Sequence, residues 1–382
     1  MHDRRPPLLF SSVAWGHGGI GWTTRPLALA IAVLAVLLPT AHAADDLRFF
    51  RIGTAATSGT YFQIGGVLAS AISKPPGTRD CEHGGSCGVA GLVAVAQATQ
   101  GSIENLLMVG AGQIESGFAQ SDLALAAYTG KGLSTAPRCH GAGDAQAVPT
   151  GAQLLKNRGP MPSLRLIAAL FPENVQIVVR AESPIHSLHD LKGKRVSMGE
   201  AASGTIADAR LVLEAGSMSE CDLKPQYLRL SRAVEALQNN EIDAFFLVAG
   251  APVPAIAEIA SLVPLRLVPI DGATLNRLMG RPPFFRAEEI PGGTYPGIDE
   301  PVQSVAVTAL WIVDAAVPDS LVYAITRSLW QDSTRRLLDF AHPVGKRIRL
   351  GNALIDTAVP LHPGAARYYA ERGMELPPNA AR

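Results

Sequence analysis

The sequence predicts an α/β protein of two lobes, in which each lobe is a mostly parallel sheet flanked by helices and two hinge strands join the lobes. Apolar runs of strand length alternate with segments of helical periodicity along most of the chain, a pattern typical of parallel sheets covered by helices. Two similar loops of small residues, 54–60 and 199–205, each join a strand to a helix. Two long apolar runs, around 176–180 and 304–313, are placed to cross between the lobes. One large doubly wound sheet is the alternative, but the repeated strand–loop–helix opening favours two similar lobes.

The individual elements follow from local patterns. In the first helix, apolar residues recur at intervals of three and four, and Pro75-Pro76 ends it. Residues 130–160 are rich in Gly, Pro and Ala and are expected to form an irregular surface excursion. Strands are expected at 48–53, 91–96, 118–121, 164–170, 176–180, 195–198, 226–230, 243–248, 265–270 and 304–313. Helices are expected at 61–73, 102–112, 122–128, 206–215, 231–239, 253–262 and 319–341.

The composition excludes several classes of protein. The chain has 382 residues with 33 basic and 33 acidic side chains, and 47% of it is hydrophobic. A zero net charge argues against a nucleic-acid binder, which needs a basic surface to neutralise phosphates. The hydrophobic content supplies a buried core and excludes wholesale disorder. No phosphate loop with the required lysine is found, and His186 and His189 lack a nearby third metal ligand, so we expect no cofactor and no metal.

The N-terminus carries an export signal. Arg25 precedes the uncharged apolar run 27–38, and the small-residue pattern 41–43 follows it, which together are typical of a secretory signal peptide at 1–43. A membrane anchor is the alternative, but the run is shorter than the ~20 residues that span a bilayer. We expect the mature chain to divide into lobe 1, residues 44–178 with 304–382, and lobe 2, residues 179–303.

An exported protein works in an oxidising space, so its four cysteines suggest disulfides. Cys81 and Cys87 bracket a Gly-rich loop and are the expected pair. Cys139 and Cys221 form a second pair or remain as two thiols, since four cysteines allow three connectivities.

The two similar loops are the main candidate for a binding site. Ser58-Gly59-Thr60 and Ser203-Gly204-Thr205 each stand at the start of a helix. The glycine allows close approach to the backbone, and the free N–H groups of the first helical turn favour an anion. Simple N-capping explains one copy, but two copies in matching positions predict a cleft that holds a small acid from both sides.

Further polar candidates follow other strands. Ser102 and Asn105 stand at a third helix start, and Gln120 follows a short strand. Each could contact a ligand or merely cap a helix. Arg180 could bind a carboxylate or form a structural ion pair.

At these residues the sequence resembles the TAXI family, the solute receptors of TRAP transporters. The resemblance covers about residues 52–372. Its pieces, in order, are Ile52-Gly53-Thr54 with Ser58-Gly59-Thr60-Tyr61, Ile64-Gly65-Gly66, Gly101-Ser102-Ile103-Glu104-Asn105, Gln120-Ser121-Asp122, Ile177-Val178-Val179-Arg180, the segment 188–196, Ser203-Gly204-Thr205, the segments 242–246 and 249–252, Ile290-Pro291-Gly292-Gly293-Thr294-Tyr295, and the segment 360–365.

The resemblance implies a type II-like periplasmic-binding-protein fold and a periplasmic location. It implies capture of a glutamate-like amino acid or a keto or dicarboxylic acid, and delivery to TRAP membrane permease subunits, without enzymatic turnover; we expect a monomer. The resemblance also implies a set of ligand contacts, to which we add the glycines of the two loops. The full set is Thr57, Ser58, Gly59, Thr60, Tyr61, Ser102, Asn105, Gln120, Ser203, Gly204, Thr205, Ala249 and Pro252.

Two other functions stay open at this point. A secreted serine hydrolase could be built around Ser86 or Ser203, although no base stands in a suggestive sequence position. Gly84-Gly85-Ser86-Cys87-Gly88 matches a nucleophile elbow but lacks the strand before it and the helix after it. A binding domain that serves a sensor instead of a permease is the third reading.

Overall fold

The computed structural model describes residues 47–131, 151–280 and 285–378. The chain separates into two units, 1–44 and 45–382, and the fold described here is that of the second. The expected signal peptide at 1–43 lies outside the described residues. No helix in the described part of the chain is both long and apolar enough to span a membrane.

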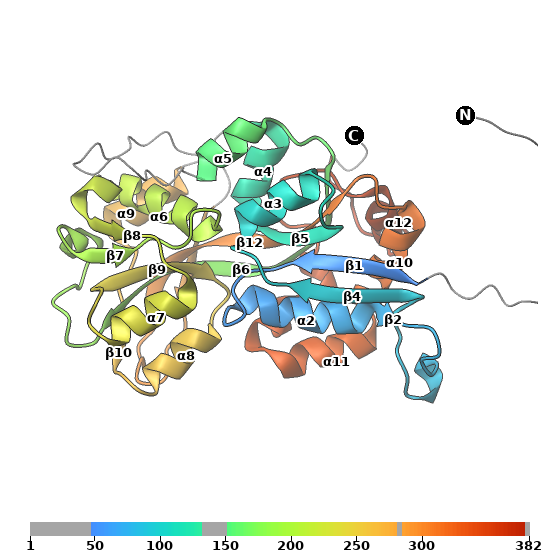
Figure 1. Ribbon diagram of the computed structural model, residues 1–382, viewed down its shortest axis with the longest axis horizontal. Coiled ribbons are helices and arrows are strands. Elements are labelled where there is room, and N and C mark those ends of the chain that lie inside the picture. Colours follow the sequence, from blue (N-terminus) through green and yellow to red (C-terminus); the bar gives the residue numbers. More distant parts are fainter. Residues whose placement is uncertain (1–46, 132–150, 281–284, 379–382) are drawn as a thin grey trace, which may run out of the picture. The chain divides into compact units, whose positions relative to one another are not determined.

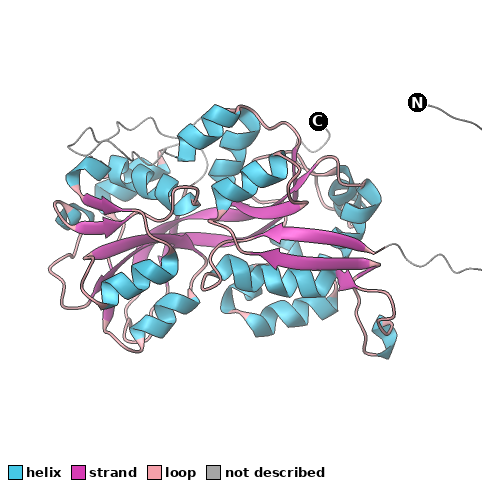
Figure 2. Ribbon diagram, viewed as in Figure 1, coloured by secondary structure: helices cyan, strands magenta, loops and turns pink. Residues whose placement is uncertain are grey.

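A ten-stranded sheet runs through the second unit (Figures 1 and 2). Its main path runs β4-β1-β5-β12-β6-β9-β7-β8, with β10 paired to β6 and β11 to β12. These strands are β1 (Arg48–Gly53), β4 (Leu92–Gln97), β5 (Ser116–Gln120), β6 (Leu164–Arg180), β7 (Arg195–Ser197), β8 (Lys224–Gln226), β9 (Ala244–Ala249), β10 (Leu265–Leu267), β11 (Arg286–Ile290) and β12 (Val302–Asp314). A separate two-stranded sheet joins β2 (Ser73–Lys74) and β3 (Val89–Ala90).

Helices cover both faces of the sheet. Figure 1 shows α3, α4, α6 and α9 on one face and α2, α7, α8 and α11 on the other. The helices are α2 (Thr60–Ile72), α3 (Ser102–Gly110), α4 (Ser121–Thr129), α5 (Gly151–Arg158), α6 (Gly204–Ala215), α7 (Leu230–Gln238), α8 (Pro254–Ala260), α9 (Gly272–Met279), α10 (Asp319–Leu329), α11 (Asp332–Ala341) and α12 (Pro363–Glu371). The predicted α/β class is therefore confirmed.

The sheet contains two parallel groups. β1 pairs in parallel with β4 and β5, and β7 pairs in parallel with β8 and β9. The long strands β6 and β12 lie between the groups and pair with each other in antiparallel orientation. Because these two strands are continuous, hydrogen bonding joins both groups into one sheet.

Three clusters of buried apolar side chains lie along this sheet. The first, here called the terminal core, contains residues from Phe50 to Tyr369 and includes the 164–171 part of β6. The other two, here called the middle cores, contain residues between Val175 and Val307 and lie on the β7–β9 side. The change from one core to the next falls within β6 and β12, the strands that were expected to cross between lobes.

Several elements differ from the sequence prediction. The runs 164–170 and 176–180 are one 17-residue strand, β6, because the intervening segment continues the ladder with β12 and β9. The single helix expected at 319–341 is two helices, since the backbone turns to an extended conformation at Gln331. Helix α5 lies at the end of the segment that was expected to be irregular, and strand β11 was not predicted.

Candidate functional site

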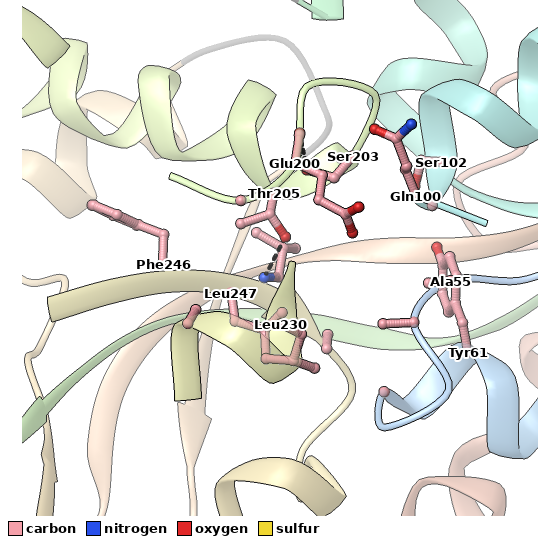
Figure 3. Close-up of a pocket in the computed structure, with 18 of the residues that line it drawn as sticks. Ala55, Tyr61, Gln100, Ser102, Glu200, Ser203, Thr205, Leu230, Phe246 and Leu247 are labelled. Atoms are coloured by element: carbon pink, nitrogen blue, oxygen red, sulfur yellow. Dashed lines mark hydrogen bonds between the residues drawn. The ribbon is translucent and has the colours of Figure 1, made fainter. Parts of the chain in front are cut away.

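A cavity lies where the terminal core meets the middle cores, at the carboxyl ends of several strands. About 80 Å³ of it is accessible to the centres of water molecules, several times the ~10–15 Å³ that one water needs. Its wall comprises Ala55, Ala56, Gly59, Thr60, Tyr61, Gln100, Gly101, Ser102, Gln120, Glu173, Ser197, Gly199, Glu200, Ser203, Gly204, Thr205, Leu228, Leu230, Ala233 and 245–249. Figure 3 shows that these side chains come from both sides of the cavity.

Three helix N-termini meet at this cavity. The N-cap residues of α2, α3 and α6 are Gly59, Gly101 and Ser203, and all three line it. The first N–H groups of a helix have no partner within the helix, and the helix dipole adds positive potential there. Three such ends directed at one space favour a negatively charged group within it.

Most of the predicted site residues lie in the cavity wall. From the first loop these are Gly59, Thr60 and Tyr61, and from the second Ser203, Gly204 and Thr205; Ser102, Gln120 and Ala249 join them. The two Ser-Gly-Thr segments therefore share one hollow.

Four predicted residues do not line the cavity: Thr57, Ser58, Asn105 and Pro252. The Asn105 side chain is buried, and its amide nitrogen donates to the carbonyls of Thr54 (2.7 Å) and Phe118 (2.8 Å). Its amide oxygen accepts from Thr99 Oγ1 at 2.8 Å. Asn105 thus joins the ends of β1 and β5 below the cavity, where it positions the backbone.

The hydroxyls of the two loops are already hydrogen-bonded to the backbone. Thr60 donates to the Gly250 carbonyl at 2.6 Å, across the boundary between the cores. Thr205 Oγ1 accepts from the Val248 N–H at 3.1 Å, and Ser203 Oγ donates to the Glu200 carbonyl at 2.7 Å. The loops therefore offer a ligand backbone N–H groups of the first helical turns and the Thr205 O–H, which only accepts a hydrogen bond here and can still donate one.

Hydrogen bonds between α3 and the second loop close the cavity on one side. The Glu104 N–H donates to the Ala202 carbonyl at 3.1 Å, and the Ala202 N–H donates to Gln100 Oε1 at 3.3 Å. A Cβ placed on Gly204 would lie 1.4 Å from Gln120 Oε1 and 3.0 Å from Ser102 Oγ. Only glycine therefore allows this close approach of α6 to the opposite wall.

Sequence reasoning missed Glu173, a buried carboxyl in the cavity wall. The Tyr61 hydroxyl donates to its Oε2 at 2.6 Å. Burial raises the pKa of Glu173 to about 8, against the lowering effect of that hydrogen bond. At neutral pH the group is therefore mostly protonated and does not repel an anion.

Two further buried carboxyls lie behind the wall. Gln120 Nε2 donates to Asp208 Oδ2 at 2.8 Å, which links β5 to α6. Burial and the nearby Asp122 raise the pKa of Asp208 well above its usual range. Burial likewise raises the pKa of Asp122.

Glu200 is the other acidic residue of the wall. Burial raises its pKa, and Arg229, 3.4 Å away, opposes that effect. Arg180, considered above as a carboxylate ligand, does not line the cavity. Its guanidinium donates to the carbonyls of Leu237 (2.7 Å) and Ile242 (3.1 Å) and pairs with Glu182.

The structure contains the expected Cys81–Cys87 disulfide, with a Cα–Cα distance of 4.6 Å. Cys221 is also disulfide-bonded, and residue 139 lies outside the described residues. Ser86, the alternative nucleophile, donates to the Ser73 carbonyl and accepts from the Gly88 N–H, so its hydroxyl bonds to the backbone and not to a base. Within residues 47–131, 151–280 and 285–378, no group of three His, Cys, Asp or Glu side chains is arranged to hold a metal ion.

Comparison with known proteins identifies the family. The sequence matches the NMT1-like family over residues 52–138 and 142–373. The chain belongs to the NMT1-like family. The match spans both loops and every strand that contributes to the cavity.

Several solved structures are similar to this NMT1-like chain. The periplasmic aliphatic sulphonate binding protein SsuA from Escherichia coli is 14% identical, with a TM-score of 0.40 over 85% of this chain and 83% of that chain. The alkanesulfonate-binding protein SsuA from Xanthomonas axonopodis pv. citri, bound to MOPS, is 16% identical, with a TM-score of 0.42 over 85% and 84%. A substrate-binding protein of an amino acid ABC transporter is 16% identical, with a TM-score of 0.40 over 78% and 100%.

Proposed function

We propose that this protein is an extracytoplasmic solute receptor, which captures a small carboxylate in the cavity and delivers it to a membrane permease without altering it. The observation that supports this most strongly is the meeting of the α2, α3 and α6 N-termini at one cavity. Such ends bind a carboxylate through backbone N–H groups, with no need for a basic side chain.

The proposal includes two lobes, 44–178 with 304–382 and 179–303, which close on the ligand. The separation into a terminal core and middle cores supports this division. The hydrogen bond from Thr60 to the Gly250 carbonyl and the one from Gln120 to Asp208 both cross that division. Breaking these bonds would open the cavity to solvent.

The proposed location is the periplasm, after removal of residues 1–43, and the proposed partner is a TRAP permease, as the TAXI resemblance implies. A hydrolase built on Ser203 is disfavoured, because its hydroxyl caps α6: it accepts from the Ile206 N–H at 3.3 Å and donates to a backbone carbonyl. No base is hydrogen-bonded to it among the described residues.

The ligand is tested by identifying the small molecule released when the purified protein is denatured, by mass spectrometry. A panel of amino, keto and hydroxy acids then follows in a thermal-shift assay, where a ligand at 100 times its Kd adds about 2.7 kcal/mol to the unfolding free energy. We expect anionic carboxylates to give the shift. Release of a molecule without a carboxylate, with no response to any acid, would contradict the proposal.

The permease type is tested separately by solute uptake in cells that express the receptor with its permease. A TRAP permease requires a cation gradient, so an ionophore should abolish uptake while ATP depletion at a clamped gradient should not. The reverse result would leave the receptor function intact and reject the TRAP assignment.

A further inference from the structure

One wall of the cavity is apolar. Leu228, Leu230 and Leu247 line it and are only half-buried, so part of each side chain faces the cavity. They pack against one of the middle cores, which holds them in place. Figure 3 shows Leu230 and Leu247 on the side formed by α7 and β9, whereas Tyr61 comes from α2 on the other side. The two sides therefore differ in chemistry: helix N-termini face leucine side chains.

The charges in the cavity wall favour a ligand with one anionic group and disfavour a ligand with two. Among the described residues that line the cavity, the only ionisable carboxyls are Glu173 and Glu200, and there is neither a lysine nor an arginine. Arg229 pairs with Glu200, and its side chain is 79% exposed. A second carboxylate on the ligand would thus contact leucines or an acidic side chain. No positively charged side chain among the described wall residues would compensate for the hydration that this carboxylate loses.

Two buried polar atoms in the wall point to a ligand independently of the helix ends. Gln120 Oε1 and Ser197 Oγ have no hydrogen-bond partner, and both side chains are only 1% exposed. Buried polar groups normally have partners. Both atoms are covered by protein in this structure, but both residues line the cavity, so a side-chain rotation toward a bound molecule would give these atoms partners near its carboxylate end.

We propose that the solute is a monocarboxylate with a polar substituent beside the carboxylate and an apolar body that packs on the leucines. This rests on the proposed function and narrows it, because it excludes solutes with a second carboxylate. The helix N-termini bind the carboxylate, the two unpartnered polar atoms bind the adjacent substituent, and the leucine wall accepts the rest.

Calorimetric titration with matched pairs of acids tests this. The pairs are leucine with glutamate, and 4-methyl-2-oxopentanoate with 2-oxoglutarate; in each pair a branched apolar end replaces a second carboxylate. We expect the apolar member to bind at least roughly 100-fold more tightly, because the second carboxylate loses its hydration against leucine. Tighter binding of glutamate or 2-oxoglutarate would overturn this inference but support an acid receptor. No binding of any of the four acids would instead count against the proposed function.

Variants in the apolar wall give a second readout. Leu230→Arg places a cation opposite the helix N-termini, and we expect it to weaken binding of the apolar acid and strengthen that of its dicarboxylate partner at least about tenfold. Leu228→Arg tests the same wall if the first variant does not fold. Leu262→Arg is the matched control, because Leu262 is 67% exposed and does not line the cavity. An unchanged preference in both wall variants would reject contact between the leucines and the ligand.

Discussion

Replacing Glu173 with glutamine isolates the effect of one buried carboxyl on stability. The side chain is 2% exposed, and burial raises its pKa from 4.5 to about 8. The folded protein therefore retains this proton at pH values where the unfolded chain has released it. Its contribution to stability is fully present below about pH 4.5 and is lost as pH rises toward 8.

The size of this loss follows from the two pKa values. Between about pH 5 and pH 9, ionisation of Glu173 in the unfolded chain lowers the unfolding free energy of the wild type by roughly 4 kcal/mol. Glutamine resembles the protonated acid in shape, and its amide oxygen can still accept from the Tyr61 hydroxyl. Glu173→Gln should therefore change stability little at pH 5 and make the protein more stable than the wild type at pH 9.

Urea unfolding followed by circular dichroism, at a series of pH values, measures this difference. Burial, the largest cause of the raised pKa values of Asp122 and Asp208, is common to both proteins and cancels in the comparison, whereas their smaller electrostatic interactions with Glu173 are part of what the substitution removes. Glu289→Gln serves as the control, because Glu289 is exposed, and it should leave the pH dependence of the wild type unchanged. If the unfolding free energies of the wild type and Glu173→Gln changed in parallel from pH 5 to pH 9, the raised pKa of Glu173 would be refuted as a source of pH-dependent stability.

Three further changes test the geometry of the cavity. Gly204→Ala places a methyl group against Gln120 and should weaken ligand binding, measured by calorimetric titration, at least roughly tenfold. Gly66→Ala is the control and should leave the affinity unchanged, because no neighbouring atom lies within 4 Å of its new Cβ. Equal affinities in both variants would mean that the close approach of Gly204 to Gln120 is unimportant for binding. Thr60→Val removes the hydrogen bond from Thr60 to the Gly250 carbonyl and should cost about 1 kcal/mol of binding free energy. We expect the ligand to dissociate faster in stopped-flow measurements. An unaltered dissociation rate would show that this bond does not hold the cavity closed. Asn105→Ala removes the side-chain donor to the Phe118 carbonyl and one of two donors to the Thr54 carbonyl, which still accepts from Thr99 Oγ1. It should lower the unfolding free energy by roughly 1–3 kcal/mol in urea unfolding. A variant as stable as the wild type, but with weakened binding, would restore Asn105 as a ligand contact.

The sequence was sufficient to predict the fold class and most of the residues in the two Ser-Gly-Thr loops that line the cavity, because both depend on local patterns. Alternating strand and helix patterns require helices on a sheet, and Ser-Gly-Thr at a helix start is visible in the sequence. The meeting of Thr60 and Thr205 at one cavity confirms that the two similar loops share a hollow.

Other features of the cavity could not be predicted from the sequence, because they depend on tertiary contacts. Glu173 lies in the middle of a 17-residue strand whose Phe-Pro-Glu-Asn segment resembles a break, and a lone acid between two apolar runs was the only signal of its burial. Leu228 and Leu230 resemble ordinary core residues in the sequence, because periodicity does not distinguish a side chain in the core from one facing a cavity. Asn105 has the composition of a ligand contact, and only the positions of two distant carbonyls reveal its structural role.

The terminal core also has a consequence for biosynthesis. Its members extend from Phe50 to Tyr369, and the Tyr369 hydroxyl donates to the Ile167 carbonyl at 2.9 Å, whereas the middle cores end by Val307. A ribosome must therefore translate nearly the whole message before the terminal core is complete, although β1 already has its sheet neighbours β4 and β5 by residue 120. A product truncated before α12 would have complete middle cores beside an unfinished terminal one, with apolar surface exposed to proteases.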